Sequence, residues 1–191
     1  MKLSSWRPLT IGSVWIRLYT KILAKRLMTA VKICNRQKGF ISAPGYEENI
    51  SILDNLIKGE KRNGEELAIV FVDLAKAFDS VGHRHIMSGL RRFGIDEHFI
   101  EIIRDLYDNC TTRVWVGDKS TESILIRSGI KQGDPLSPIL FNIAMDPLFT
   151  KLETEGSGFY VQGNSITSLA FADDMAILSG SYQGMAKTWE F

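Results

Sequence analysis

Apolar residues at helical spacing predict two helices in the first third of the chain. Between Val14 and Val31 they recur every three or four positions, which is the pattern of an amphipathic helix. Its expected buried residues are Trp15, Leu18, Tyr19, Ile22, Leu23, Leu27 and Ala30. A second helix is expected from about Tyr46 to Lys58, with Ile50, Leu53, Leu56 and Ile57 on its apolar face.

Two other stretches have the pattern of strands and carry the most suggestive charges. The unbroken apolar run Leu67–Val72 is rich in β-branched residues and predicts a strand buried on both faces, with Asp73 at its end. In Leu169–Leu178, Asp173 and Asp174 stand between two apolar runs. That pattern predicts a tight hairpin of two buried strands with both carboxylates at its tip.

The rest of the chain alternates between shorter elements and breaker-rich loops. Helices are expected over His85–Phe93 and Asp96–Asn109, the second capped by Asp96. The remaining expected elements are a hairpin of Thr112–Val116 with Ser123–Arg127, a loop over Ser128–Pro138, a helix from Ser137 to about Glu155, and strands over Phe159–Val161 and Ser165–Phe171.

The three aspartates suggest a metal site. Adjacent carboxylates are hard oxygen ligands of the kind that magnesium prefers. If the strand that ends at Asp73 lies beside the hairpin, Asp73, Asp173 and Asp174 converge and could hold two divalent ions about 4 Å apart for phosphoryl transfer. The alternative for an isolated Asp-Asp pair is an exposed loop, and without Asp73 it would be the preferred interpretation.

Charge is unevenly spread along the 191 residues, although the net charge is only +1. Met1–Phe40 holds nine Lys and Arg residues and no acid, whereas the remainder holds 14 basic and 22 acidic residues. Such asymmetry suggests a polyanion or phosphate partner on one face. Arg17, Lys21 and Lys25 follow one another at four-residue spacing and could track a phosphate backbone, or form an ordinary solvated helix face.

Several other classes of site receive no support. Cys34 and Cys110 lack metal-ligand spacing, so we expect buried thiols in a reducing compartment. His83, His85 and His98 do not have the spacing of a metal trio. No run approaches the roughly 18 apolar residues of a membrane span, and the N-terminal residues lack a signal-peptide core. We therefore expect a soluble intracellular protein without a membrane partner.

Three segments resemble motifs A, B and C of reverse transcriptases, in the right order and with the right separations. They are Phe71–Val81, Gly129–Pro138 and Ala170–Asp174. Together with Arg7-Pro8-Leu9 and Gln37-Lys38-Gly39-Phe40, their sequences are most similar to those of the reverse transcriptases of non-LTR (LINE-type) retrotransposons, especially elements inserted at specific sites in ribosomal DNA. The resemblance runs from about Trp6 to Leu178.

The resemblance implies roles for four residues around the metal ions. Asp73 and Asp173 would be the metal-bridging carboxylates, and Asp174 would be a supporting ligand or charge. The backbone carbonyl of Leu74 would complete the shell of one metal. The cofactor would be two Mg²⁺ ions, with Mn²⁺ as a substitute.

Four further residues would contact the substrate. Phe78 occupies the position of the steric gate, whose ring excludes a ribose 2′-hydroxyl and so favours deoxynucleotides. Gln132 and Gly133 would line the nucleotide and template pocket. Arg7 would meet the incoming triphosphate, because its planar fork matches phosphate oxygens. The implied partners are an RNA template, a DNA primer and deoxynucleoside triphosphates.

The implied fold is an α+β palm-and-fingers reverse transcriptase, a right-hand polymerase with an antiparallel palm sheet backed by helices. Residues 1–66 would form a basic, mostly helical fingers portion, and 67–191 the palm, with an insertion at about 82–128. Relative to similar proteins we expect a truncated fragment that lacks the thumb, is weak or inactive in isolation, and acts in the nucleus at the insertion site after cytoplasmic translation.

Two alternatives to this interpretation stay open. The chain could be a non-catalytic nucleic-acid-binding remnant whose basic N-terminal segment binds RNA. Within the enzyme class it could be a group II intron or retron type of reverse transcriptase, although the Ala-Lys-Ala-Phe-Asp and Phe-Ala-Asp-Asp wording fits LINE-type elements better. The sequence does not indicate an oligomeric state.

Overall fold

The computed structural model describes residues 9–41, 45–64, 66–161 and 163–190. The chain forms two compact units, and each is built from two separate segments. The first unit comprises Met1–Lys32 and Lys76–Ala144, and the second comprises Ile33–Ala75 and Met145–Phe191. The division into fingers at 1–66 and palm at 67–191 follows chain order instead, and it stays a prediction.

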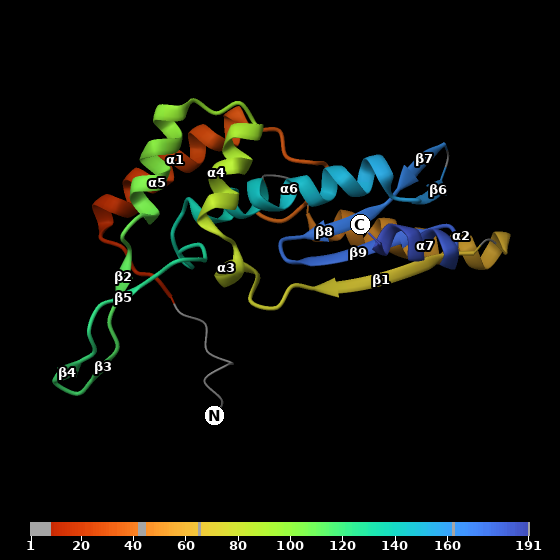
Figure 1. Ribbon diagram of the computed structural model, residues 1–191. Helices are drawn as coiled ribbons and strands as arrows, with labels where there is room; N and C mark the ends of the chain where they lie inside the picture. Colours follow the sequence, from red (N-terminus) through yellow and green to blue (C-terminus); the bar gives the residue numbers. More distant parts are fainter. Residues whose placement is uncertain (1–8, 42–44, 65, 162, 191) are drawn as a thin grey trace. The chain divides into compact units, whose positions relative to one another are not determined.

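The second unit is organised around a three-stranded antiparallel sheet (Figure 1). Its strands are β1 (Ala68–Asp73), β8 (Ser168–Phe171) and β9 (Asp174–Ser179), in the order β1-β9-β8. Strand β9, the second strand of the predicted hairpin, is central in the sheet and therefore lies directly beside β1, the strand that ends at Asp73. Mixed helices and an antiparallel sheet confirm the expected α+β class.

Both faces of this sheet carry an apolar core. On one face, the buried side chains of Ala170, Met175 and Ile177 cluster with side chains of α6 (Ser137–Glu155) and α7 (Tyr182–Trp189). On the other face, Leu169 and Leu178 cluster with residues of α2 (Tyr46–Asn63) and of β6 (Phe159–Val161), which pairs with β7 (Asn164–Ile166). Packing on both faces makes the sheet a rigid platform for whatever its strand ends carry.

Strand β1 does not have the burial that its sequence predicts. It is an edge strand, and the ring of Phe71 is 72% exposed. Over this end of the sheet lies a cavity of about 350 Å³ instead of a packed side chain. The prediction of a strand buried on both faces was therefore wrong, because an apolar run shows that a strand can be buried but not which part of it another element covers.

The first unit is mainly helical. It contains α1 (Val14–Ala30), α3 (Ala77–Ser80), α4 (His83–Arg92), α5 (Glu97–Tyr107) and the start of α6. Asp96 caps α5 as predicted, and its carboxylate accepts hydrogen bonds from the backbone N–H groups of His98 at 3.0 Å and Phe99 at 3.4 Å. The predicted hairpin consists of two short ladders, with β2 (Thr111–Thr112) paired to β5 (Ile124–Leu125) and β3 (Trp115–Val116) to β4 (Lys119–Ser120).

Helix α1 begins at the predicted Val14 and ends at Ala30, one residue before the predicted Val31, and its buried face is narrower than expected. Its buried residues are Thr20, Leu23, Ala24 and Leu27. Trp15 is 80% exposed, and Leu18, Tyr19, Ile22 and Ala30 are exposed as well, so their expected burial was wrong. Apolar residues occupy more of the helix surface than the rest of the unit covers. As a result, one groove is lined by both the basic residues and an exposed apolar one, namely Arg17, Lys21, Lys25 and Leu18. The helix therefore does not divide into a basic face and a fully buried apolar face.

The two cysteines are partly buried, and two of the histidines lie within hydrogen-bond distance of backbone carbonyl oxygens. Cys34 and Cys110 are free and partly buried, and burial raises the pKa of the Cys34 thiol. The imidazole Nε2 of His83 lies 3.0 Å from the carbonyl oxygen of Gly129, and that of His85 lies 2.8 Å from the carbonyl oxygen of Ala144. Among the helices within the described ranges, none combines the length and apolar character needed to cross a bilayer.

The exposure of Phe71 can be tested by substitution. Because the ring is 72% exposed, Phe71→Thr should change the free energy of unfolding by no more than about 0.5 kcal/mol. Leu178→Ala is the matched control on the same face, at a side chain that is 0% exposed, and it should cost about 2–5 kcal/mol. Urea unfolding followed by circular dichroism measures both, and equal losses would show that β1 is buried on both faces.

Candidate functional site

The hairpin between β8 and β9 turns over two residues, Ala172 and Asp173. Phe171 pairs with Asp174 across the hairpin, so Asp173 lies in the turn and Asp174 opens β9. Ala172 has a φ of 58°, in the left-handed region that residues other than glycine rarely adopt. The predicted tight turn with both carboxylates at its tip is confirmed.

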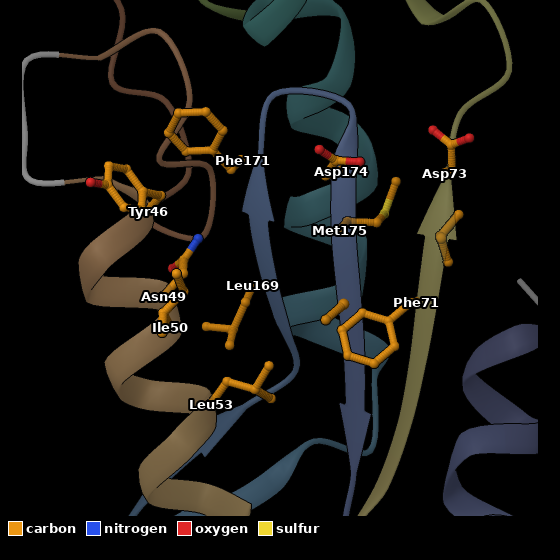
Figure 2. A pocket seen from close by; sticks show the side chains of 12 residues that line it. Tyr46, Asn49, Ile50, Leu53, Phe71, Asp73, Leu169, Phe171, Asp174 and Met175 are labelled. Atoms are coloured by element: carbon orange, nitrogen blue, oxygen red, sulfur yellow. The ribbon is translucent and has the colours of Figure 1, made fainter.

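Asp73 and Asp174 lie directly opposite each other in the register of β1 and β9. Directly opposed residues of an antiparallel pair project from the same face, with Cβ atoms about 4.5–5.5 Å apart. Figure 2 shows the two carboxylates at neighbouring strand ends. Both residues are exposed, and in the described part of the chain neither forms an ion pair. Two like charges in this arrangement repel each other and destabilise the strand end.

This pair suits a divalent cation on chemical grounds. Carboxylate oxygens are hard donors, and magnesium is usually held by one or two carboxylates together with water and substrate phosphates. A cation between the strand ends would also remove the repulsion between Asp73 and Asp174. The donor set and its exposure therefore fit the metal that the sequence suggests.

The structure brings together two of the three predicted carboxylates most directly. Within the described ranges, no set of three or more His, Cys, Asp or Glu side chains is close enough to hold a metal ion by itself. Asp173 follows Ala172 in the turn, and Leu74 follows the last residue of β1. The shared role of all three aspartates and the role of the Leu74 carbonyl stay predictions.

An apolar cavity begins at the carboxylate pair and extends over the sheet. It has a volume of about 350 Å³, with Asp73 and Asp174 in its wall. Figure 2 shows that α2, β1, β8 and β9 provide its other side chains, among them Tyr46, Phe71 and Phe171. The rings of Tyr46 and Phe171 meet edge to face, with centroids 6.4 Å apart. The strand ends thus present charge and the adjoining surface presents aromatic rings.

Sequence reasoning missed the aromatic wall of this cavity. Tyr46 and Phe171 lie in stretches whose patterns predict only a helix start and a buried strand. No local pattern distinguishes an apolar residue at a cavity wall from one in a packed core. Alternation along β1 puts Phe71 on the same face as Asp73, and the pairing of β1 with β9 brings that face beside Asp174.

The predicted substrate residues Phe78, Gln132 and Gly133 belong to the first unit. The ring of Phe78 stacks on buried Phe141, with centroids 4.7 Å apart and planes 3° from parallel. The side-chain amide of Gln132 donates to Asp79 Oδ1 at 2.7 Å, and Gly133 has a φ of 97°. Because Ile130 N–H also donates to the Phe78 carbonyl at 2.8 Å, the motif B loop is fixed against α3. Arg7 lies outside the described residues.

A second cavity lies beside this loop within the first unit. It has a volume of about 340 Å³, and its wall includes Lys131, Gln132 and Tyr107. The Lys131 ammonium sits 5.1 Å from the centre of the Tyr107 ring. Burial raises the pKa of the Tyr107 hydroxyl to about 12. The ring therefore stays neutral throughout the physiological pH range.

The raised pKa of Tyr107 predicts a loss of stability at high pH. The unfolded chain ionises this hydroxyl near its ordinary pKa of 10.0, whereas the folded chain keeps its proton up to a pH of about 12. Stability from Tyr107 is thus complete below pH ~10 and lost as the pH rises towards ~12. Tyr107→Phe should flatten the unfolding free energy over that range, and an unchanged profile would contradict the burial of Tyr107.

Comparison with known proteins finds relatives among retrotransposon Pol polyproteins. The Pol polyprotein of the type-1 retrotransposable element R2 from Popillia japonica is 43% identical over 92% of this chain, and the one from Nasonia vitripennis is 39% identical over 94%. The chain spans 25% and 18% of these two proteins. These similarities bear out the resemblance to retrotransposon reverse transcriptases.

A solved structure and a family profile complete the comparison. Telomerase from Candida tropicalis, in complex with a fragment of telomeric RNA, matches 92% of this chain and 30% of its own, with a TM-score of 0.63 at 13% identity. That likeness shows the fold, and it agrees with the expected palm-and-fingers class. The profile of the reverse transcriptase (RNA-dependent DNA polymerase) family matches residues 2–190. Since that match covers nearly the whole chain, this protein belongs to the reverse transcriptase family.

Proposed function

We propose that this chain carries the catalytic carboxylates of an RNA-directed DNA polymerase encoded by a non-LTR retrotransposon. The observation that carries the proposal is the placement of Asp73 opposite Asp174 at the ends of β1 and β9. Family membership and the similarity to R2 Pol polyproteins support the same reaction. The reaction would add deoxynucleotides to a primer 3′-hydroxyl along an RNA template.

Asp73, Asp173 and Asp174 would hold the metal ions, with Mg²⁺ as the ordinary ion and Mn²⁺ as a substitute. Bound divalent ions lower the pKa of an attacking hydroxyl and neutralise a leaving pyrophosphate. The protein contributes position and charge, since phosphoryl transfer needs little covalent help from side chains. Pairing of β1 with β9 fixes the spacing of the two opposed aspartates, and packing on both sheet faces holds those strands in place.

Phe78 and the motif B loop support a role in selecting deoxynucleotides. A ring stacked on buried Phe141 cannot move aside easily, so it could exclude a ribose 2′-hydroxyl. Gly133 has a φ of 97°, and a side chain there would strain the backbone. A loop without that side chain leaves its backbone accessible to a nucleotide.

A basic groove favours nucleic acid as the partner and also supports the second candidate function. Arg17, Lys21 and Lys25 line a groove of about 600 Å³ along α1. A non-catalytic RNA-binding remnant would use this groove and need no metal. RNA binding that is salt-sensitive and survives the loss of all three aspartates, in a chain that binds no metal, would favour the remnant over the polymerase.

Metal binding by Asp73 tests the proposed function directly. Asp73→Asn replaces an anionic ligand with a neutral amide of equal size, so Mn²⁺ affinity should fall by about tenfold or more. Electron paramagnetic resonance of free Mn²⁺ in a titration of the chain measures this affinity. Asp105→Asn, at an exposed aspartate of α5, is the matched control and should bind Mn²⁺ as the wild type does. Equal affinity in the Asp73 variant would overturn the proposal.

Removing one of the opposed charges should have opposite effects on stability and metal binding. Without metal, Asp174→Asn removes the repulsion from Asp73 and should raise the free energy of unfolding by about 0.2–1 kcal/mol. The same change should weaken Mn²⁺ binding, because a charged ligand is lost. Urea unfolding in the presence of a chelator measures the first effect. A variant less stable than the wild type would show that the two carboxylates do not repel each other in the folded chain.

A further inference from the structure

The turn that carries the aspartates contains a residue in an unfavourable backbone conformation. Ala172 has a φ of 58°, where the Cβ of an ordinary residue meets its own backbone. A conformation of this kind is unfavourable and persists only where the surrounding structure imposes it. A two-residue hairpin turn commonly places its first residue at positive φ, and contacts around the turn then hold Ala172, and with it Asp173 and Asp174, in this conformation.

The side chain of Gln37 supplies that restraint. Its amide Nε2 donates to the Ala172 carbonyl at 2.9 Å, and its Oε1 accepts from the Ala172 N–H at 2.8 Å. The same Oε1 accepts from the Gly39 N–H at 2.8 Å, and Gln37 is 0% exposed. One carboxamide thus satisfies both backbone polar groups of the strained residue. The amide offers a donor and an acceptor side by side, so neither an ionised carboxylate nor an apolar side chain can replace it fully.

The neighbouring backbone brings Gln37 to this position. Ala170 N–H donates to the Arg36 carbonyl at 3.0 Å, and Lys38 N–H donates to the Ala170 carbonyl at 2.9 Å. These bonds form a short parallel bridge between Gln37 and Ala170, two residues before the turn. The segment therefore lies along β8, and the Gln37 side chain reaches the tip of the hairpin.

Gly39 makes the close approach possible. A Cβ atom at this position would lie 2.2 Å from the Ala172 nitrogen and 2.8 Å from its Cα, which no side chain could occupy. Gln37 and Gly39 are two of the four residues in the Gln-Lys-Gly-Phe segment. Both residue types are explained by contact with the backbone of Ala172, which Gln37 binds and Gly39 leaves room for.

We propose that Gln37 is a positioning residue for the carboxylate pair, acting through the backbone of Ala172, with Gly39 permitting the contact. This inference rests on the proposed function, because it assigns Gln37 the task of keeping Asp174 opposite Asp73. Without the Gln37 amide, Ala172 relaxes towards a negative φ and the turn opens. The aspartates then lose their fixed spacing while the rest of the sheet stays folded.

The test compares Gln37→Met with a control of similar burial. Gln37→Met keeps the size of the side chain and removes all three of its hydrogen bonds. Thr188→Val removes a buried hydroxyl of the same unit that donates to the Gly184 carbonyl at 3.0 Å, away from the hairpin. Gln37→Met should weaken Mn²⁺ binding by about tenfold, as loss of an outer-shell partner typically does, whereas Thr188→Val should leave it unchanged. Equal Mn²⁺ affinity in Gln37→Met and wild type, or an equal loss in both variants, overturns the proposal.

A second substitution tests whether the effect passes through Ala172. Glycine adopts positive φ readily, so adding Ala172→Gly to Gln37→Met should recover part of the lost Mn²⁺ affinity. No recovery would mean that Gln37 does not act through the conformation of the turn. If Gln37→Met fails to fold, Gln37→Glu replaces it and is measured at a pH where its carboxyl is ionised, because the ionised side chain keeps the acceptor and lacks the donor to the Ala172 carbonyl. Gln37→Glu should lose Mn²⁺ affinity, but by less than the roughly tenfold loss expected for Gln37→Met. An Mn²⁺ affinity equal to that of the wild type would overturn the proposal.

Hydrogen exchange separates this inference from the proposed function. In the metal-free chain, the Ala172 amide should exchange at least about tenfold faster in Gln37→Met than in Thr188→Val, because its acceptor is gone. Equal exchange would overturn the role of Gln37 whether or not the chain binds metal. Absence of Mn²⁺ binding in the wild type, with fast exchange confined to Gln37→Met, would instead sink the proposed function and keep the restraint on Ala172.

Discussion

The structure of the site depends on the antiparallel pairing of β1 with β9, which sets Asp73 opposite Asp174. Farther along the same pair, Ile69 lies opposite Leu178 within an apolar cluster that contains both. Burial of those side chains stabilises the pairing, and the pairing in turn forces two negative charges together at the exposed end. The apolar part of the sheet therefore supports a local arrangement that would be unfavourable without a cation.

Unfavourable features gather at this one end of the sheet. The opposed carboxylates, the positive φ of Ala172 and the exposed ring of Phe71 all lie within a few residues of the strand ends. Natural proteins break local rules mainly at functional sites and compensate elsewhere. Here the compensation comes from the buried amide of Gln37 and from the packed cores on both sheet faces. These unfavourable features lie at the motif residues, which supports assigning the functional site to this end of the sheet.

Much of this arrangement was predictable from local sequence. The apolar runs on each side of Asp173 and Asp174 predict the hairpin, and the run before Asp73 predicts the strand, because strand patterns extend over only a few residues. The cap at Asp96 and the bounds of α1 follow in the same way. Motif order then suggested that distant aspartates meet.

The remaining features depend on contacts that no local pattern encodes. Phe71 and Leu178 are equally apolar in sequence, yet the first is exposed and the second is buried, because helix α2 covers only part of the sheet face. Leu18 is exposed and Leu23 is buried because the rest of the first unit covers only part of the surface of α1. The role of Gln37 depends on a residue 135 positions away, so its segment contributed to the family resemblance but predicted no contact with the hairpin.

The most direct test of the central claim is the position of a bound ion. Anomalous scattering from crystals of the chain grown with Mn²⁺ would locate that ion without assumptions about activity. The pairing of β1 with β9 predicts a manganese peak within about 2.3 Å of carboxylate oxygens from both Asp73 and Asp174. A well-occupied peak that contacts neither residue, or crystals in which the two strand ends bind no manganese, would contradict it.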